Sequence, residues 1–162
     1  MQQPSLRVRA MQLLARREHS RAELARKLAA HAETAEEIET VLDELAKRGM
    51  LSDARFAEMR THILSKKFGA ARIAQDLRAR GVSDELAGKA VDGARASEVE
   101  RARSAWAKRF RVPPANALEK AKQMRFLQGR GFSFDTIRAV VPAKFSAPAG
   151  DTGEDDDTLA DE

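Results

Sequence analysis

The stretch GMLSDARFAEMRTHILSKKFGAARIAQDLRARGV, residues 49–82, sets the plan of the whole chain. Ser52 is a suitable N-cap for a first helix, since its hydroxyl can accept a hydrogen bond from a free N–H group of the first turn. Phe56, Met59 and Ile63 follow at helical spacing. The first half of this stretch therefore predicts a helix with one apolar face.

Two glycines divide the stretch. We expect Gly69 to end the first helix in the left-handed conformation, because glycine adopts that conformation at little cost. Lys66 and Lys67 just before it suit the negative end of a helix. A second helix follows, centred on Leu77, and ends at Gly81. The stretch is therefore predicted to hold two short helices, each closed by a glycine.

The same layout recurs on both sides of this stretch. Leu28 lies 49 residues before Leu77, and Leu127 lies 50 residues after it. The tripeptide RGV at 80–82 corresponds to RGF at 130–132. A period of this length with three helical patterns in each copy indicates an internal repeat. We therefore predict that Leu28, Leu77 and Leu127 are equivalent core residues; the alternative is chance similarity among ordinary amphipathic helices.

The predicted fold is all-α. Alanine, leucine and charged residues dominate and β-branched residues are sparse, which is typical of helices. We expect three tandem three-helix repeats of helix-turn-helix type in an elongated, curved array. The repeats are placed at residues 1–49, 50–95 and 96–141, and a disordered acidic tail is expected at 142–162.

Two details of the packing are also predicted. Leu118, Ala121 and Met124 or Leu127 should form the apolar face of the second helix in the last repeat. Gly88 and Gly93 should weaken the helix that begins at Ser83, by roughly 1 kcal/mol each relative to alanine, unless close packing requires them.

Charge is divided unevenly along the chain. The formal net charge is +4, but residues 1–141 carry +10, and residues 142–162 carry −6 from one lysine and seven acids. A basic body of this kind favours a polyanionic partner, with nucleic acid first among the candidates. The alternative is an ordinary basic surface without a partner.

No catalytic, cofactor-binding or metal-binding site is predicted. The chain has no cysteine, which excludes disulfides and thiolate metal sites. Glu58 and His62 lie four residues apart, but no third ligand stands at a supporting spacing. No glycine-rich phosphate loop or nucleophile elbow is found. Because no long apolar segment stands at the N-terminus, we expect neither a signal peptide nor a membrane span, and a cytoplasmic location.

Basic residues gather in the second and third repeats, interleaved with phenylalanines. Cations beside an aromatic ring can hold a phosphate backbone and stack a base. Nothing in the pattern specifies a base sequence, so contact is expected to be independent of sequence. The rings could instead pack between helices, which we favour for Phe110 and Phe132. The candidate contact residues are Lys66, Lys67, Arg72, Arg78, Arg80, Lys122, Arg125 and Arg130.

Four segments in a fixed order characterise residues 6–141: LLARREHS at 13–20, GMLSDARFA at 49–57, GAARI at 69–73 and RGF at 130–132. No single motif is diagnostic, but the order and spacing of the motifs are specific. In these segments the chain resembles the bacterial RecX family, whose members modulate the RecA recombinase.

The resemblance implies a regulator without enzymatic activity that binds RecA filaments on DNA and inhibits RecA. It implies a place in recombination, DNA repair and the SOS response. RecA is then the partner, with single-stranded DNA bound without sequence preference, and we expect a monomer that needs no cofactor or membrane. Two alternatives stay open: a nucleic-acid-binding protein of helix-turn-helix type acting without RecA, and a structural adaptor, which would need no basic surface.

We predict that the acidic tail competes with DNA for the basic body. Ending the chain after Val141 should tighten DNA binding at low salt, because a segment of net charge −6 is removed. Fluorescence anisotropy with a labelled oligonucleotide, at low and high salt, measures the effect. Equal affinities of the full and the shortened chain at low salt would contradict the competition.

Overall fold

The computed structural model describes residues 3–145, and the secondary-structure elements of this part of the chain are all helices. Most of the predicted acidic tail lies outside the described residues. The helices are α1 (Leu6–Arg16), α2 (Arg21–Leu28), a short 3-10 helix η1 (Ala29–His31), α3 (Ala35–Lys47), α4 (Asp53–Leu64), α5 (Ala70–Ala79), α6 (Asp84–Arg95), α7 (Glu98–Arg109), α8 (Ala117–Gly129) and α9 (Phe134–Val140).

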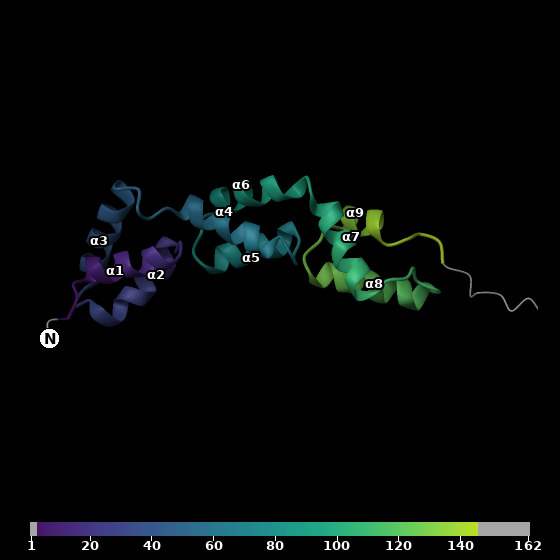
Figure 1. Cartoon of the computed structure of the whole chain (residues 1–162), viewed down its shortest axis with the longest axis horizontal. Helices are drawn as coiled ribbons and strands as arrows, with labels where there is room; N and C mark the ends of the chain where they lie inside the picture. The colour runs from purple at the N-terminus through teal and green to yellow at the C-terminus, as the bar shows by residue number, and fades with distance from the viewer. Residues whose placement is uncertain (1–2, 146–162) are drawn as a thin grey trace, which may run out of the picture.

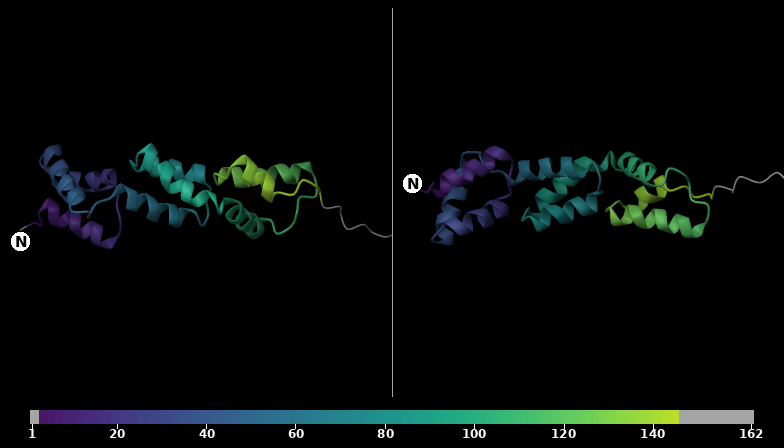
Figure 2. Two further views of the ribbon diagram at one scale, coloured as in Figure 1. Left: turned by 90° about the horizontal axis from the view of Figure 1, so that it is seen from above. Right: turned by 60° about the horizontal axis from the view of Figure 1, so that its bottom comes forward.

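The helices form three groups that follow one another along one axis (Figure 1). Helices α1 to α3 make repeat 1, α4 to α6 make repeat 2, and α7 to α9 make repeat 3. Each repeat buries its own cluster of apolar side chains. The two further views show the same elongated arrangement (Figure 2). The prediction of an all-α array of three three-helix repeats is confirmed.

Side-chain caps begin most of the helices, and the cap predicted at Ser52 is confirmed. The hydroxyls of Ser20, Thr34, Ser52, Ser83 and Ser133 each accept a hydrogen bond from the N–H group three residues on. Such a bond satisfies one of the N–H groups that a helix leaves without a partner at its start. The sequence thus fixes where these five helices begin.

Gly81 and Gly131 end the middle helices α5 and α8 in the left-handed conformation, with φ of +81° and +82°. The N–H of Val82 returns to the carbonyl of Leu77 at 3.0 Å, and the N–H of Phe132 returns to that of Leu127 at 3.3 Å. This is the six-to-one bond of a Schellman motif, which closes the last turn of a helix. The two RG turns are therefore equivalent, as their sequences predict.

The prediction for Gly69 is wrong. Gly69 has a φ of −82° and is the N-cap of α5, while α4 ends at Leu64. Glycine is required there for space: a Cβ atom on Gly69 would lie 2.4 Å from the carbonyl oxygen of Gly131. The close approach of repeat 3, rather than a left-handed turn, accounts for this glycine.

Two predicted core positions also prove wrong, since Leu118 is 76% exposed and Ile63 is 48% exposed. In α8 the buried place is taken by Gln123, whose amide oxygen accepts from the Trp106 indole N–H at 2.8 Å. A polar residue can be buried there because its hydrogen bonds are satisfied.

Close packing does not require Gly88 or Gly93 of α6, because a Cβ atom on either residue would meet open space.

The core residues that align the three repeats are confirmed. Leu28, Leu77 and Leu127 are each fully buried, one in each apolar cluster. Leu77 packs among residues of repeat 2 that include Phe56, Ile73 and Val82. The three leucines hold equivalent places in three separate cores.

We predict that Leu77→Ala lowers the free energy of unfolding by about 2–5 kcal/mol, because it leaves a cavity in a closed core. Equilibrium urea unfolding, followed by circular dichroism, measures the change. Leu118→Ala, at an exposed position in a similar helix, serves as the control and should change stability little. A loss below about 0.5 kcal/mol at Leu77 would contradict the described packing.

Candidate nucleic-acid interface

Each junction between repeats is built on the N-terminus of a middle helix. The N–H of Arg21, first residue of α2, donates to Asp53 Oδ1 at 2.7 Å. The N–H of Ala70, first residue of α5, donates to Glu98 Oε1 at 3.0 Å. Asp53 and Glu98 are the first residues of α4 and α7. The acid at the start of each following repeat thus accepts a hydrogen bond from a free N–H group at the positive end of the preceding middle helix.

A second contact recurs at both junctions. The Ser20 hydroxyl donates to the carbonyl of Arg80 at 2.6 Å, and the Gly69 N–H donates to the carbonyl of Arg130 at 2.9 Å. The C-terminal ends of α5 and α8 therefore each contact the N-cap residue of the preceding middle helix, α2 or α5. The contact is close, since a Cβ on Gly81 would lie 2.4 Å from that of Ala22.

Ion pairs reinforce the first junction. Arg80 reaches Glu23 of repeat 1 at 2.5 Å and Asp76 of its own helix at 3.1 Å, and Arg60 reaches Asp76 at 2.8 Å. Burial raises the pKa of Glu23, but hydrogen bonds from Arg80 and Arg17 outweigh it and hold the pKa below its usual value. The Arg80–Glu23 pair joins repeats 1 and 2, while the pairs of Asp76 with Arg60 and Arg80 lie within repeat 2.

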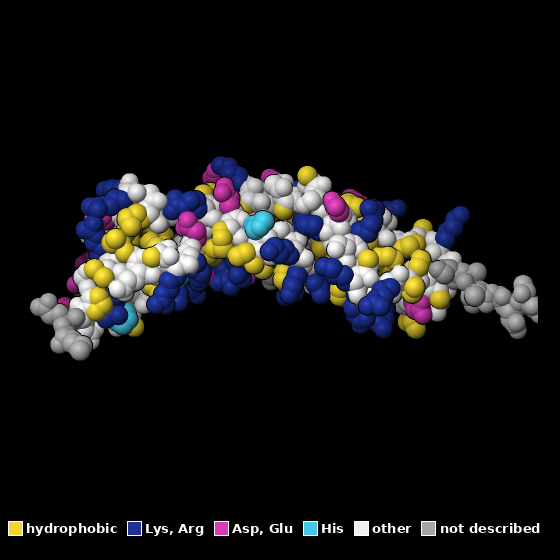
Figure 3. All heavy atoms as spheres, viewed as in Figure 1, with side chains coloured by type: hydrophobic (Ala, Val, Ile, Leu, Met, Phe, Trp, Pro, Cys, Tyr) yellow, Lys and Arg dark blue, Asp and Glu magenta, His cyan; other side chains and the backbone are white. Residues whose placement is uncertain are grey.

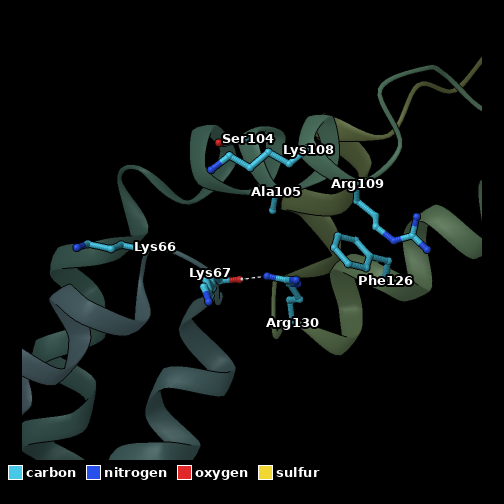
Figure 4. Close-up of a pocket in the computed structure, with 8 residues that line it drawn as sticks. All are labelled: Lys66, Lys67, Ser104, Ala105, Lys108, Arg109, Phe126 and Arg130. Atoms are coloured by element: carbon cyan, nitrogen blue, oxygen red, sulfur yellow. Dashed lines mark hydrogen bonds between the residues drawn. The ribbon is translucent and has the colours of Figure 1, made fainter.

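The second junction carries a basic pocket of about 410 Å³ (Figure 4). Lys66 and Lys67 come from the segment between α4 and α5, while the other walls come from α7, α8 and the turn after α8. No acid lines the pocket. We call this site the junction pocket; its lining residues are Lys66, Lys67, Ser104, Ala105, Lys108, Arg109, Phe126 and Arg130.

Aromatic rings hold one arginine of the junction pocket and a second arginine beside it. Arg130 places its guanidinium carbon 4.8 Å from the centre of the Phe126 ring, and Arg72 places its own 4.6 Å from that of Phe68. The Arg72 side chain also donates to the carbonyl of Gly129 at 3.0 Å. Cation–π contacts of this kind position a guanidinium without neutralising it.

The structure brings together only part of the candidate set. Lys66, Lys67 and Arg130 line the junction pocket, and Arg72 lies beside it. The other four candidates lie elsewhere: Arg78 pairs with Asp84, Arg80 belongs to the first junction, and Lys122 and Arg125 are exposed on α8 outside the pocket.

Three polar residues of the pocket, Ser104, Lys108 and Arg109, are absent from the sequence-based candidate set. They lie on α7, where the apolar spacing of Ala102 and Trp106 dominates the pattern. Ser104 and Lys108 stand four residues apart and so share one helix face. That spacing is the sequence signal that could have indicated a polar face on α7. It does not indicate that Lys66 and Lys67 lie opposite this face.

Basic side chains recur along the lower, concave edge of the array in the view of Figure 3. The third repeat is the most basic: residues 96–141 hold ten lysines and arginines against four acids. Within residues 3–145 no three acids or histidines lie close enough to hold a metal ion. Nor is any helix of this part of the chain long and apolar enough to span a bilayer.

The fold defines a helical-repeat protein. Comparison with known families agrees with the three repeats. The first, second and third three-helix domains of RecX match residues 7–45, 52–91 and 96–141.

The chain belongs to the RecX family. It is 52% identical over 139 residues to the regulatory protein RecX of Leptothrix cholodnii, covering 86% of this chain and 88% of that one. It is 48% identical over 137 residues to the regulatory protein RecX of Ralstonia nicotianae, covering 85% and 86%. The crystal structure of RecX from Lactobacillus salivarius shares the fold, with a TM-score of 0.72 at 21% identity over 83% of this chain and 91% of that one.

Glu98 of the second junction is a buried carboxylate with several hydrogen-bond donors. Burial raises its pKa, but hydrogen bonds from the Ala70 N–H and the Thr136 and Ser133 hydroxyls outweigh burial and lower the pKa below its usual value. A lowered pKa means that the carboxylate stabilises the fold above the unfolded-state pKa of about 4.3, and that this stability is lost as pH falls through the folded-state pKa.

We therefore predict that Glu98→Gln lowers the free energy of unfolding by about 1.5–3 kcal/mol at neutral pH, the value of hydrogen bonds to a charged group. The variant should also lose less stability than the native chain as pH falls below about 4.3. Urea unfolding across this pH range measures both effects. Glu100→Gln, exposed on the same helix, is the control; equal behaviour of the two variants would contradict the role of Glu98.

Proposed function

We propose that this chain binds RecA filaments assembled on DNA and lowers the activity of RecA without chemistry of its own. Membership in the RecX family makes RecA the expected partner. The observation that carries the proposal is the shape of the chain: an arched array of three repeats with basic side chains along one edge (Figure 3).

An extended array suits a partner that repeats along an axis. Each repeat can contact a different part of the filament, and linked contacts add through their effective concentration. The two polar junctions hold the repeats in one order and orientation. A set of weak contacts along the array can therefore give stable binding to a filament and weak binding to a single RecA molecule.

DNA in the filament is the second proposed partner. The basic edge supports contact with phosphates, which is independent of base sequence. We propose that the bound DNA is single-stranded, that the chain acts as a monomer in the cytoplasm, and that it takes part in recombination, DNA repair and the SOS response.

The competing proposal is a nucleic-acid-binding protein of helix-turn-helix type that acts without RecA. Such a protein would present the first residues of one helix to base edges in a major groove. The cations here favour backbone contact instead, because the pocket lies between two repeats and the N-termini of α2 and α5 are covered by the following repeats.

We predict that the chain lowers the DNA-dependent ATPase activity of RecA at concentrations well below those that would coat the DNA. A filament binder acts on assembled RecA, whereas a DNA competitor must cover the strand. The measurement is a titration at fixed RecA, repeated while free single-stranded DNA is raised. Recovery of full activity in proportion to the added DNA would show a DNA competitor and contradict filament binding.

A further inference from the structure

We propose that the junction pocket holds the phosphodiester backbone of a single nucleic-acid strand and that the bound strand clamps repeats 2 and 3 together. The choice of DNA as ligand rests on the proposed function. The proposal goes beyond that function in three respects. It assigns the strand to one site, and it adds Ser104, Lys108 and Arg109 to the contact residues. It also states that strand binding holds repeats 2 and 3 together.

The positive charges of the junction pocket favour an anionic ligand. Five of its eight lining residues are lysine or arginine. Within residues 3–145 none of these five makes an ion pair, although many cations elsewhere do. Like charges in one pocket repel one another, so an anion that enters gains favourable energy without displacing an existing partner.

The shape and chemistry fit a strand better than an isolated ion. A volume of about 410 Å³ is in the range of ligand pockets. Lys66 and Lys67 lie on one side and Lys108 on the other, with the Phe126 ring forming part of the wall (Figure 4). Cations along a groove with an aromatic side chain are the usual means of binding single strands, and the Ser104 hydroxyl adds a donor for a phosphate oxygen.

The pocket spans two repeats, so its occupant must touch both. Lys66 and Lys67 belong to the segment between α4 and α5 of repeat 2, whereas the remaining lining residues belong to repeat 3. Among the hydrogen bonds that cross this junction, the Gly69 N–H donates to the carbonyl of Arg130 at 2.9 Å, and Arg130 Nη1 donates to the carbonyl of Lys67 at 3.4 Å. A strand held from both sides opposes opening of the junction and should protect the Gly69 amide from exchange.

The first test is binding of a short oligothymidylate to the full chain. Lys67→Gln with Lys108→Gln removes one cation from each side of the pocket. Lys89→Gln with Arg95→Gln is the matched control, since it removes two exposed, ion-paired cations of α6 outside the junction pocket. The slope of log K against log salt should fall by about 1.4 for the first pair and stay unchanged for the control. Equal slopes for the two variants would overturn the site.

The second test follows amide hydrogen exchange in the native chain. Oligothymidylate should slow exchange at Gly69 but not at Val82, whose N–H bonds to Leu77 within repeat 2. The Lys67→Gln, Lys108→Gln variant should not show this protection at the same oligonucleotide concentration. Unchanged exchange at Gly69 in the native chain, with the strand bound, would overturn the clamp.

Two competitors define the ligand. Inorganic tripolyphosphate should displace the strand less well than unlabelled oligothymidylate at equal phosphate concentration, and a duplex of the same length should bind more weakly. Equal competition by tripolyphosphate would reduce the pocket to a general anion site, and equal binding of the duplex would remove the preference for a single strand. RecA is absent from these assays, so their failure overturns the pocket alone, and the RecA titration decides the proposed function separately.

Discussion

The array depends on the N–H groups that begin α2 and α5. A helix leaves its first N–H groups without partners inside the helix, and burying such a group unpaired is costly. In this chain the following repeat supplies the acceptor, Asp53 at the first junction and Glu98 at the second. Because these hydrogen bonds are directional and the three apolar cores are separate, the polar junctions determine the orientation of each repeat relative to the next.

The sequence predicts the repeats well because their signals are local. N-caps, apolar spacing and the two RG turns each depend on residues within a few positions, so Leu28, Leu77 and Leu127 can be aligned from the sequence alone. Gly69 cannot be understood in this way, since its lack of a side chain is explained by Gly131 of another repeat. Glu98 looks like an ordinary first-turn acid, but it serves as acceptor for another helix.

The candidate interface was predicted only in part for a similar reason. Composition locates the basic repeats, but it does not say which cations are engaged. Arg80 looks as available as Lys67 in the sequence, yet Glu23 and Asp76 bind its guanidinium, while Lys67 stands in a pocket without acids. Lys108 becomes part of the candidate site only because repeat 3 brings α7 opposite the segment between α4 and α5 (Figure 4). The availability of a charge is therefore a tertiary property, and it decides where a polyanion can bind.

Two polar junctions make three small repeats into one arched body, and the distance between the outer repeats tests this most directly. The chain has no cysteine, so His31→Cys with Lys122→Cys introduces two unique sites for spin labels, both exposed, in repeats 1 and 3. Double electron–electron resonance measures the distribution of distances between the two labels. We expect a single narrow distribution that broadens when Asp53 or Glu98 is replaced by alanine. A broad distribution in the otherwise native chain would contradict the rigid array.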